Sequence, residues 1–100
     1  MPEQPMMRYR TLDPEFAGLV HEAEELALAD GALPRKTKLL IAMLFDAEHG
    51  ATEGVQALAR QALQAGATRQ EILEALRVVE HLCGVGCLFT AAKALEGVLP

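Results

Sequence analysis

The sequence predicts an all-α protein that assembles into a homo-oligomer. Of its 100 residues, 51% are hydrophobic but only 4% are aromatic, so the core must be built from alanine, leucine, valine and isoleucine, and alanine and leucine favour helix. Apolar residues recur at helical spacing, and no segment resembles a strand. A domain of this length buries a core only modestly. We therefore expect a largely apolar contact between copies of the chain.

The first ten residues differ from the rest of the chain. They contain two prolines and show no apolar periodicity. Residues 1–10 are therefore predicted to be a flexible N-terminal arm. Residues 11–100 are predicted to be one helical domain of about five helices.

The first predicted helix begins at Asp13, an N-cap residue that precedes Pro14 at the first helical position. It is expected to end at Gly31. Its apolar residues repeat at helical spacing, and they are Phe16, Leu19, Val20, Ala23 and Ala27. The opposite face carries a run of glutamates at positions 22, 24 and 25 and is expected to be solvated.

The next two predicted helices differ in how much of their surface is apolar. Pro34 opens the second helix, which is apolar on nearly all sides over residues 39–47 and is therefore expected to be central. The third begins near Thr52 and ends at Gly66. Its apolar residues form a stripe on one side, consisting of Val55, Leu58, Ala59, Ala62 and Leu63.

Thr68 and Glu71 have the spacing of a capping box at the start of a fourth helix. Its inward face is predicted to consist of Ile72, Leu73, Leu76 and Val79. Glycine is costly inside a helix, so Gly84 and Gly86 predict a break after about residue 82. The last helix is then expected over residues 87–97.

Charge and length exclude several classes of function. The formal net charge is −5 and the sequence pI is about 5.1, which argues against nucleic acid as a partner. The N-terminal sequence MPEQPMMRYR is unlike a signal peptide, and the longest apolar run, residues 39–45, is too short to cross a membrane. We therefore expect a cytoplasmic protein.

A small basic cluster, Arg35, Lys36 and Lys38, could bind an anionic ligand, remain solvated, or pair with carboxylates across a subunit contact.

Three segments occur in a distinctive order: LPRKTKLLIAM, ALARQALQAGATRQEILEAL, and a glycine-rich break followed by AAKAL. Over residues 33–96 the chain resembles the carboxymuconolactone decarboxylase and alkylhydroperoxidase AhpD superfamily. The resemblance implies a helical subunit that assembles into trimers or hexamers.

The same resemblance implies activities whose residues are missing from this chain. AhpD-like members carry a Cys-x-x-Cys motif, a histidine four residues later and a glutamate in the central helix. In this sequence those positions are Ala51, Gly54, Leu58 and Leu39, none of which can do acid, base or thiol chemistry. The decarboxylase branch has the same histidine, so Leu58 weakens that assignment too.

The two cysteines of the chain flank the predicted helix break. Cys83 and Cys87, with His81 and Glu80 adjacent in sequence, are the candidate catalytic residues of a thiol-dependent peroxide or disulfide reductase. In this hypothesis Cys83 attacks, Cys87 resolves the oxidised form, and His81 or Glu80 transfers protons. His49 and Glu48, at the end of the central helix, are candidates to approach the thiols in space.

Two other interpretations of these residues remain open. Cysteine is commonly buried as a small hydrophobe, so both thiols could serve only helix packing in an oligomeric protein that binds a small molecule without catalysis. Alternatively, His81 and the two cysteines, completed by His49 or Glu48, could bind zinc. The sequence predicts no cofactor, and we expect a small molecule and further copies of the chain as partners.

Overall fold

The computed structural model describes residues 5–100, which form six α-helices and no strand. The helices are α1 (Pro5–Leu12), α2 (Pro14–Leu28), α3 (Arg35–Glu48), α4 (Thr52–Gln64), α5 (Arg69–Cys83) and α6 (Gly86–Leu95). The predicted all-helical class is confirmed, with six helices where about five were expected. The additional helix, α1, covers residues that the sequence analysis assigned to the N-terminal arm; residues 1–4 of that arm lie outside the described residues. None of the described helices has the length and apolar character needed to cross a membrane.

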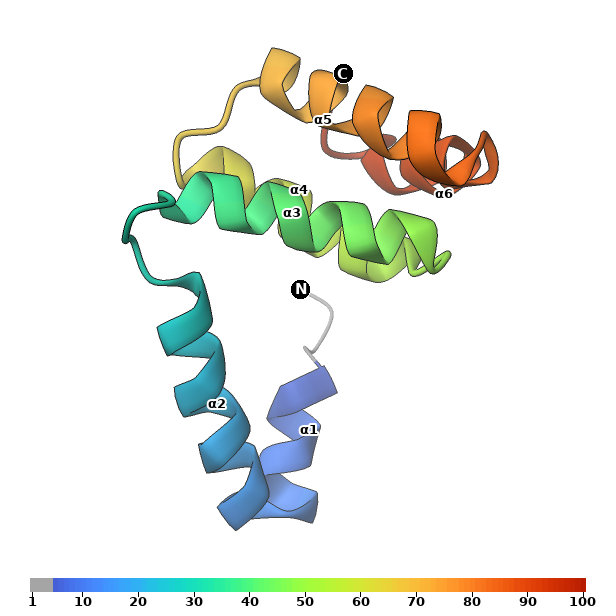
Figure 1. Cartoon of the computed structure of the whole chain (residues 1–100). Helices are drawn as coiled ribbons and strands as arrows, with labels where there is room; N and C mark the ends of the chain where they lie inside the picture. Colours follow the sequence, from blue (N-terminus) through green and yellow to red (C-terminus); the bar gives the residue numbers. More distant parts are fainter. Residues whose placement is uncertain (1–4) are drawn as a thin grey trace.

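Helices α3 to α6 form a four-helix body (Figure 1). Helix α3 packs against α4, α5 and α6, as expected for the central helix. The main apolar cluster draws residues from all four helices, and Met43, Val55 and Ile72 are its largest fully buried side chains. Burying a side chain of this size stabilises the fold by about 1.5–3 kcal/mol. The body therefore has a core of its own.

Helices α1 and α2 form a hairpin that projects from the body (Figure 1). Asp13 caps α2 as predicted, because its carboxylate accepts a hydrogen bond from the Phe16 N–H at 3.2 Å. The predicted apolar repeat of α2 is nevertheless mostly uncovered: Phe16 is 51% exposed and Leu19 is 59% exposed, whereas Val20 is partly buried. Ala17 is the only buried residue of this helix. The hairpin therefore adds almost nothing to the core.

The joint between α2 and α3 involves two residues of the predicted basic cluster. The Arg35 guanidinium donates to the Leu28 carbonyl at 3.4 Å, and Lys38 Nζ donates to the Ala29 carbonyl at 2.6 Å. Cations are stabilising beside the carbonyl end of a helix. The Leu28 side chain packs at the same place against a small second cluster of buried residues, Leu39, Ala62 and Ala67. These contacts join the hairpin to the body at the end of α2.

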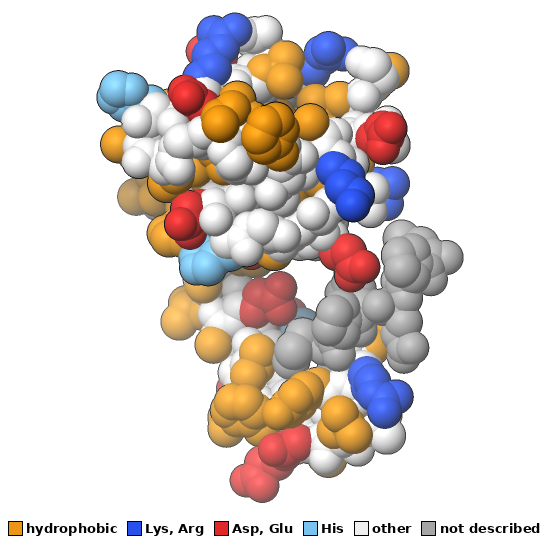
Figure 2. All heavy atoms as spheres, turned by 90° about the vertical axis from the view of Figure 1, so that its right-hand side faces the viewer, with side chains coloured by type: hydrophobic (Ala, Val, Ile, Leu, Met, Phe, Trp, Pro, Cys, Tyr) orange, Lys and Arg blue, Asp and Glu red, His pale blue; other side chains and the backbone are white. Residues whose placement is uncertain are grey.

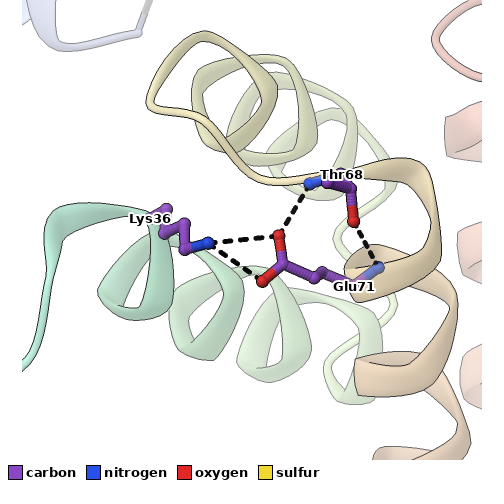
Figure 3. A network of polar contacts seen from close by, with 3 residues as sticks. All are labelled: Lys36, Thr68 and Glu71. Atoms are coloured by element: carbon purple, nitrogen blue, oxygen red, sulfur yellow. Dashed lines mark hydrogen bonds and ion pairs between the residues drawn. The ribbon is translucent and has the colours of Figure 1, made fainter.

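The third basic residue, Lys36, connects α3 to the start of α5 (Figure 3). The predicted capping box is confirmed: the Glu71 N–H donates to Thr68 Oγ1 at 3.0 Å, and the Thr68 N–H donates to Glu71 Oε1 at 2.8 Å. Lys36 Nζ donates to both carboxylate oxygens of Glu71, at 3.3 and 3.0 Å. The Thr68 N–H and then the Lys36 ammonium lower the pKa of Glu71 below its ordinary value.

The predicted helix break is also confirmed. Helix α5 ends at Cys83, and Gly84 has a φ of +93°, which residues with a side chain rarely adopt. The chain then turns and begins α6 at Gly86, close to the predicted start at residue 87. Because α3 and α5 run side by side and end close together, the last turns of both helices meet at one end of the body (Figure 1).

Candidate functional site

A cavity of about 340 Å³ lies where the C-terminal ends of α3 and α5 meet. It is lined from α3 by Leu44, Phe45, Glu48 and His49, and from α5 by Val78, Val79, Leu82 and Cys83. Five of these eight residues are apolar. Small-molecule sites typically combine mostly apolar walls with a few polar groups that orient the ligand. This cavity has that composition, with Glu48, His49 and Cys83 as its polar residues.

The imidazole of His49 is oriented by its own helix. His49 Nδ1 lies 2.7 Å from the Phe45 carbonyl oxygen and 3.3 Å from Glu48 Oε2. A carbonyl oxygen only accepts hydrogen bonds, so Nδ1 must carry the proton. In the neutral ring, Nε2 is then left as the nitrogen with a lone pair. His49 can therefore act as a proton acceptor through Nε2.

The two cysteines lie in different surroundings, and neither forms a disulfide. Cys83 is exposed and lines the cavity with His49. Cys87 is buried in the main apolar cluster, and its thiol donates to the Gly84 carbonyl at 2.9 Å. The structure thus gives Cys83 access to a cavity and gives Cys87 a packing environment.

The other two candidate catalytic residues lie away from this cavity. Glu80 lines a second cavity of about 470 Å³, which is formed between α5 and α6 by Leu73, Leu76, Arg77, Glu80, Leu88, Ala91, Ala92 and Leu95. His81 is exposed and lines neither cavity. The structure therefore brings Cys83 together with His49 and Glu48 rather than with His81 and Glu80.

The zinc hypothesis finds no support in the described residues. Within residues 5–100, no group of three or more histidine, cysteine or acidic side chains is placed to hold a metal ion. The thiol of Cys87 is turned to a backbone carbonyl, and His81 lies away from the Cys83 cavity. The predicted zinc ligands therefore do not lie together around one point.

Of the four positions that correspond to the active residues of AhpD-like proteins, Leu39, Gly54 and Leu58 are at least partly buried, whereas Ala51 is exposed. Leu39 is fully buried in the second cluster, and Leu58 packs against it. At Gly54 a β-carbon would overlap the carboxylate of Asp46, with Cγ only 2.8 Å away. Neither a thiol nor a water-filled space can be accommodated there without rearrangement. This region of α3 and α4 is therefore structural.

Sequence reasoning identified the polar residues of the cavity but missed most of its apolar wall. Val78 and Leu82 are one helical turn apart on α5, outside the predicted inward face, and are 56% and 74% exposed. The sequence feature that could have predicted this wall is the pair of large apolar residues beside the inward-facing stripe of α5. Leu44 and Phe45 belong to the cavity wall because of the way α3 packs against α5, and a local sequence pattern does not predict this packing.

Comparisons with known proteins agree with this fold. A family model described as the carboxymuconolactone decarboxylase family matches residues 14–97. The crystal structure of apo-lpg0406, a carboxymuconolactone decarboxylase family protein from Legionella pneumophila, is similar to this chain with a TM-score of 0.84 and 32% sequence identity. The similarity covers 91% of this chain and 81% of the Legionella chain. No curated protein matches the sequence.

Proposed function

The chain belongs to the carboxymuconolactone decarboxylase family, and we propose that it is a homo-oligomer of three or six subunits that binds a small, mostly apolar molecule between α3 and α5. The observation that carries this proposal is the lining of the cavity, which consists of five apolar residues and the three polar residues Glu48, His49 and Cys83. The apolar wall would supply affinity. Glu48, His49 and Cys83 would orient one polar group of the ligand.

Filling the cavity tests this proposal. Val78→Trp places a large ring on the cavity wall, whereas Ile41→Trp adds the same ring to α3 at a residue that is 43% exposed and does not line the cavity. Binding of the fluorescent probe 1-anilinonaphthalene-8-sulfonate should weaken at least tenfold in Val78→Trp and stay nearly unchanged in Ile41→Trp. Equal binding by both variants would contradict the proposal.

A second function, thiol-dependent peroxide reduction, is favoured by the presence of Cys83 and His49 in one cavity. His49 Nε2 would accept the thiol proton, and the Cys83 sulfur would attack the peroxide. The O–O bond breaks, the sulfur becomes a sulfenic acid, and the proton leaves with the departing alkoxide or hydroxide. Attack by the Cys87 thiol then forms a disulfide and releases water, and an external dithiol restores both thiols.

The second function depends on a local opening of the structure, because one of its two thiols is buried. Because Cys87 lies in the core, the disulfide step requires the segment around Gly84 to open. In a peroxide assay supplied with dithiothreitol in excess, Cys83→Ser should abolish turnover, and His49→Gln should slow it at least tenfold. Cys87→Ala should still consume one equivalent of peroxide without added dithiol. Folded protein whose two thiols remain unoxidised by peroxide at neutral pH would exclude the function.

A further inference from the structure

Within residues 5–100, two groups of large apolar side chains stand out as exposed. The hairpin stripe consists of Phe16, Leu19, Ala23 and Leu26, which share one face of α2 at helical spacing. The end patch consists of Phe45, Val78, Leu82 and Val85, the first three of which also line the cavity. The large residues of both surfaces are between 51% and 80% exposed. Figure 2 shows hydrophobic side chains at the surface of both the body, above, and the hairpin, below.

The surface area of the chain is large for its mass. The accessible surface is 6923 Å² for 10.8 kDa, whereas a compact monomer of this mass would expose about 5,500 Å². A standard protein–protein contact removes about 800 Å² from each partner. The excess of accessible surface over that of a compact monomer is therefore close to the area that two contacts per chain would bury. Two contacts per chain are expected if each copy uses two different surfaces to bind its neighbours.

Charge opposes one of the possible pairings of these surfaces. Residues 5–33, which include the hairpin, carry six carboxylates and two arginines, a net charge of −4. Residues 34–100, which form the body, carry seven charges of each sign and are neutral. Packing two hairpins together would bring like charges into proximity, which opposes association. Packing a hairpin on the body of another copy avoids this repulsion.

We propose that the hairpin stripe of one copy packs on the end patch of a second copy and closes the open side of the Cys83 cavity. The proposal builds on the homo-oligomer proposed above and names its contact. Since the two surfaces differ, the contact is head-to-tail, and repetition of it gives a ring when the rotation closes. The cavity of each subunit is then completed by side chains from its neighbour.

Single carboxylate substitutions test each half of the contact. Leu26→Glu alters the hairpin stripe, and Leu82→Glu alters the end patch. Each should be monomeric at micromolar concentration in sedimentation velocity, with a dissociation constant raised at least tenfold. His21→Glu adds the same group to α2 outside the stripe, and Ala92→Glu adds it to α6 outside the end patch; both controls should assemble as the unaltered protein does. Circular dichroism confirms that each variant is folded.

Mixing the two variants distinguishes the head-to-tail contact from other pairings. The Leu82→Glu copy keeps an intact hairpin, and the Leu26→Glu copy keeps an intact end patch, so an equimolar mixture should form a one-to-one dimer and nothing larger. Pairing of like surfaces would instead let one or both variants dimerise alone, through the surface that each keeps intact, and mixing would add no new species. A mixture that remains monomeric, or either variant assembling normally alone, would overturn the inference.

The probe-binding comparison keeps this inference separate from the proposed function. If assembly follows the prediction but Val78→Trp binds the probe normally, the contact stands and the binding proposal fails. If Val78→Trp loses the probe but Leu26→Glu still assembles, the contact is wrong and the binding proposal stands.

Discussion

The body and the hairpin are both made of amphipathic helices, but they differ in what covers their apolar faces. Among the described residues, every buried residue except Ala17 lies between α3 and α6. The apolar residues of α2 recur at helical spacing like those of α4, yet Phe16, Leu19 and Leu26 are more than half exposed. Helical periodicity therefore identifies an apolar face without identifying the surface that covers it.

The polar contacts of the two regions differ in the same way. In the body, Glu71 accepts hydrogen bonds from both its own cap and Lys36 on another helix. In the hairpin, His21 Nε2 and Glu25 Oε1 lie 3.0 Å apart within one helix, and both side chains are at least half exposed. Exposed pairs of this kind contribute little to stability. The body is therefore stabilised by a polar side-chain contact between two helices, whereas the polar side-chain contact between His21 and Glu25 in the hairpin lies within α2.

The largest expected difference between the regions is in core substitution. Ile72→Ala, at a fully buried residue of the body, should lower the free energy of unfolding by about 2–5 kcal/mol at any protein concentration. Leu19→Ala, in the hairpin, should lower stability only where the protein is assembled, because partner binding stabilises the folded state by mass action. Denaturant unfolding over a dilution series measures both. An equal loss for Leu19→Ala at the lowest concentration would show that the hairpin has a core of its own.

Alanine substitutions at two helical glycines, one in the body and one in the hairpin, should change stability in opposite directions. Gly54→Ala in α4 should cost about 1–3 kcal/mol because its β-carbon would overlap Asp46. Gly18→Ala in α2 has no neighbour within 4 Å and should add about 0.4–1 kcal/mol. Thermal unfolding measures both. The double variant with Asp46→Ala should recover the stability lost at Gly54; a double variant no more stable than Gly54→Ala alone would refute the overlap.

Removing the two helix caps should have smaller effects. Thr68→Ala, which breaks the reciprocal capping box of α5, should cost about 1–2 kcal/mol. Asp13→Ala, which removes a single cap hydrogen bond from the hairpin, should cost about 0.5–1 kcal/mol. Chemical denaturation at neutral pH measures both values. A larger loss at Asp13 would mean that α2 is coupled to the core more tightly than its burial indicates.

The smallest expected effect concerns the charge of Glu71. Its pKa is lowered in the folded protein, so its charge stabilises the fold at pH values above the ordinary glutamate pKa of about 4.3. This contribution is lost as the pH falls through the lower folded pKa. Glu71→Gln should therefore be less stable than the unaltered protein at pH 7 and equally stable at pH 2.

The control for this prediction lies in the hairpin. Glu25→Gln should show almost no difference from the unaltered protein in the same pH series, because its carboxylate is exposed and pairs only within α2. Melting temperatures between pH 2 and pH 7 report both variants. A pH-independent difference for Glu71→Gln would show that its hydrogen bonds, rather than its charge, stabilise α5.

By itself, the sequence determined helices α2 to α6 and the approximate positions of their ends, whereas the residues of α1 were predicted to belong to a flexible arm. Asp13, the Thr68 and Glu71 pair, and Gly84 act through hydrogen bonds and backbone angles within a few residues, so their effects could be predicted without the fold. The family resemblance followed from the order of the segments and is confirmed. Which helix is central followed from the apolar character of residues 39–47.

Only the tertiary structure decided the surroundings of each side chain. Cys83 and Cys87 are four residues apart, yet one lines a cavity and the other is buried, because the turn at Gly84 redirects the chain between them. His49 rather than His81 lines the same cavity as Cys83 because α3 and α5 end at the same place. The uncovered stripe of α2 likewise depends on where the hairpin leaves the body. These outcomes arise from contacts between residues distant in sequence, which local spacing does not encode.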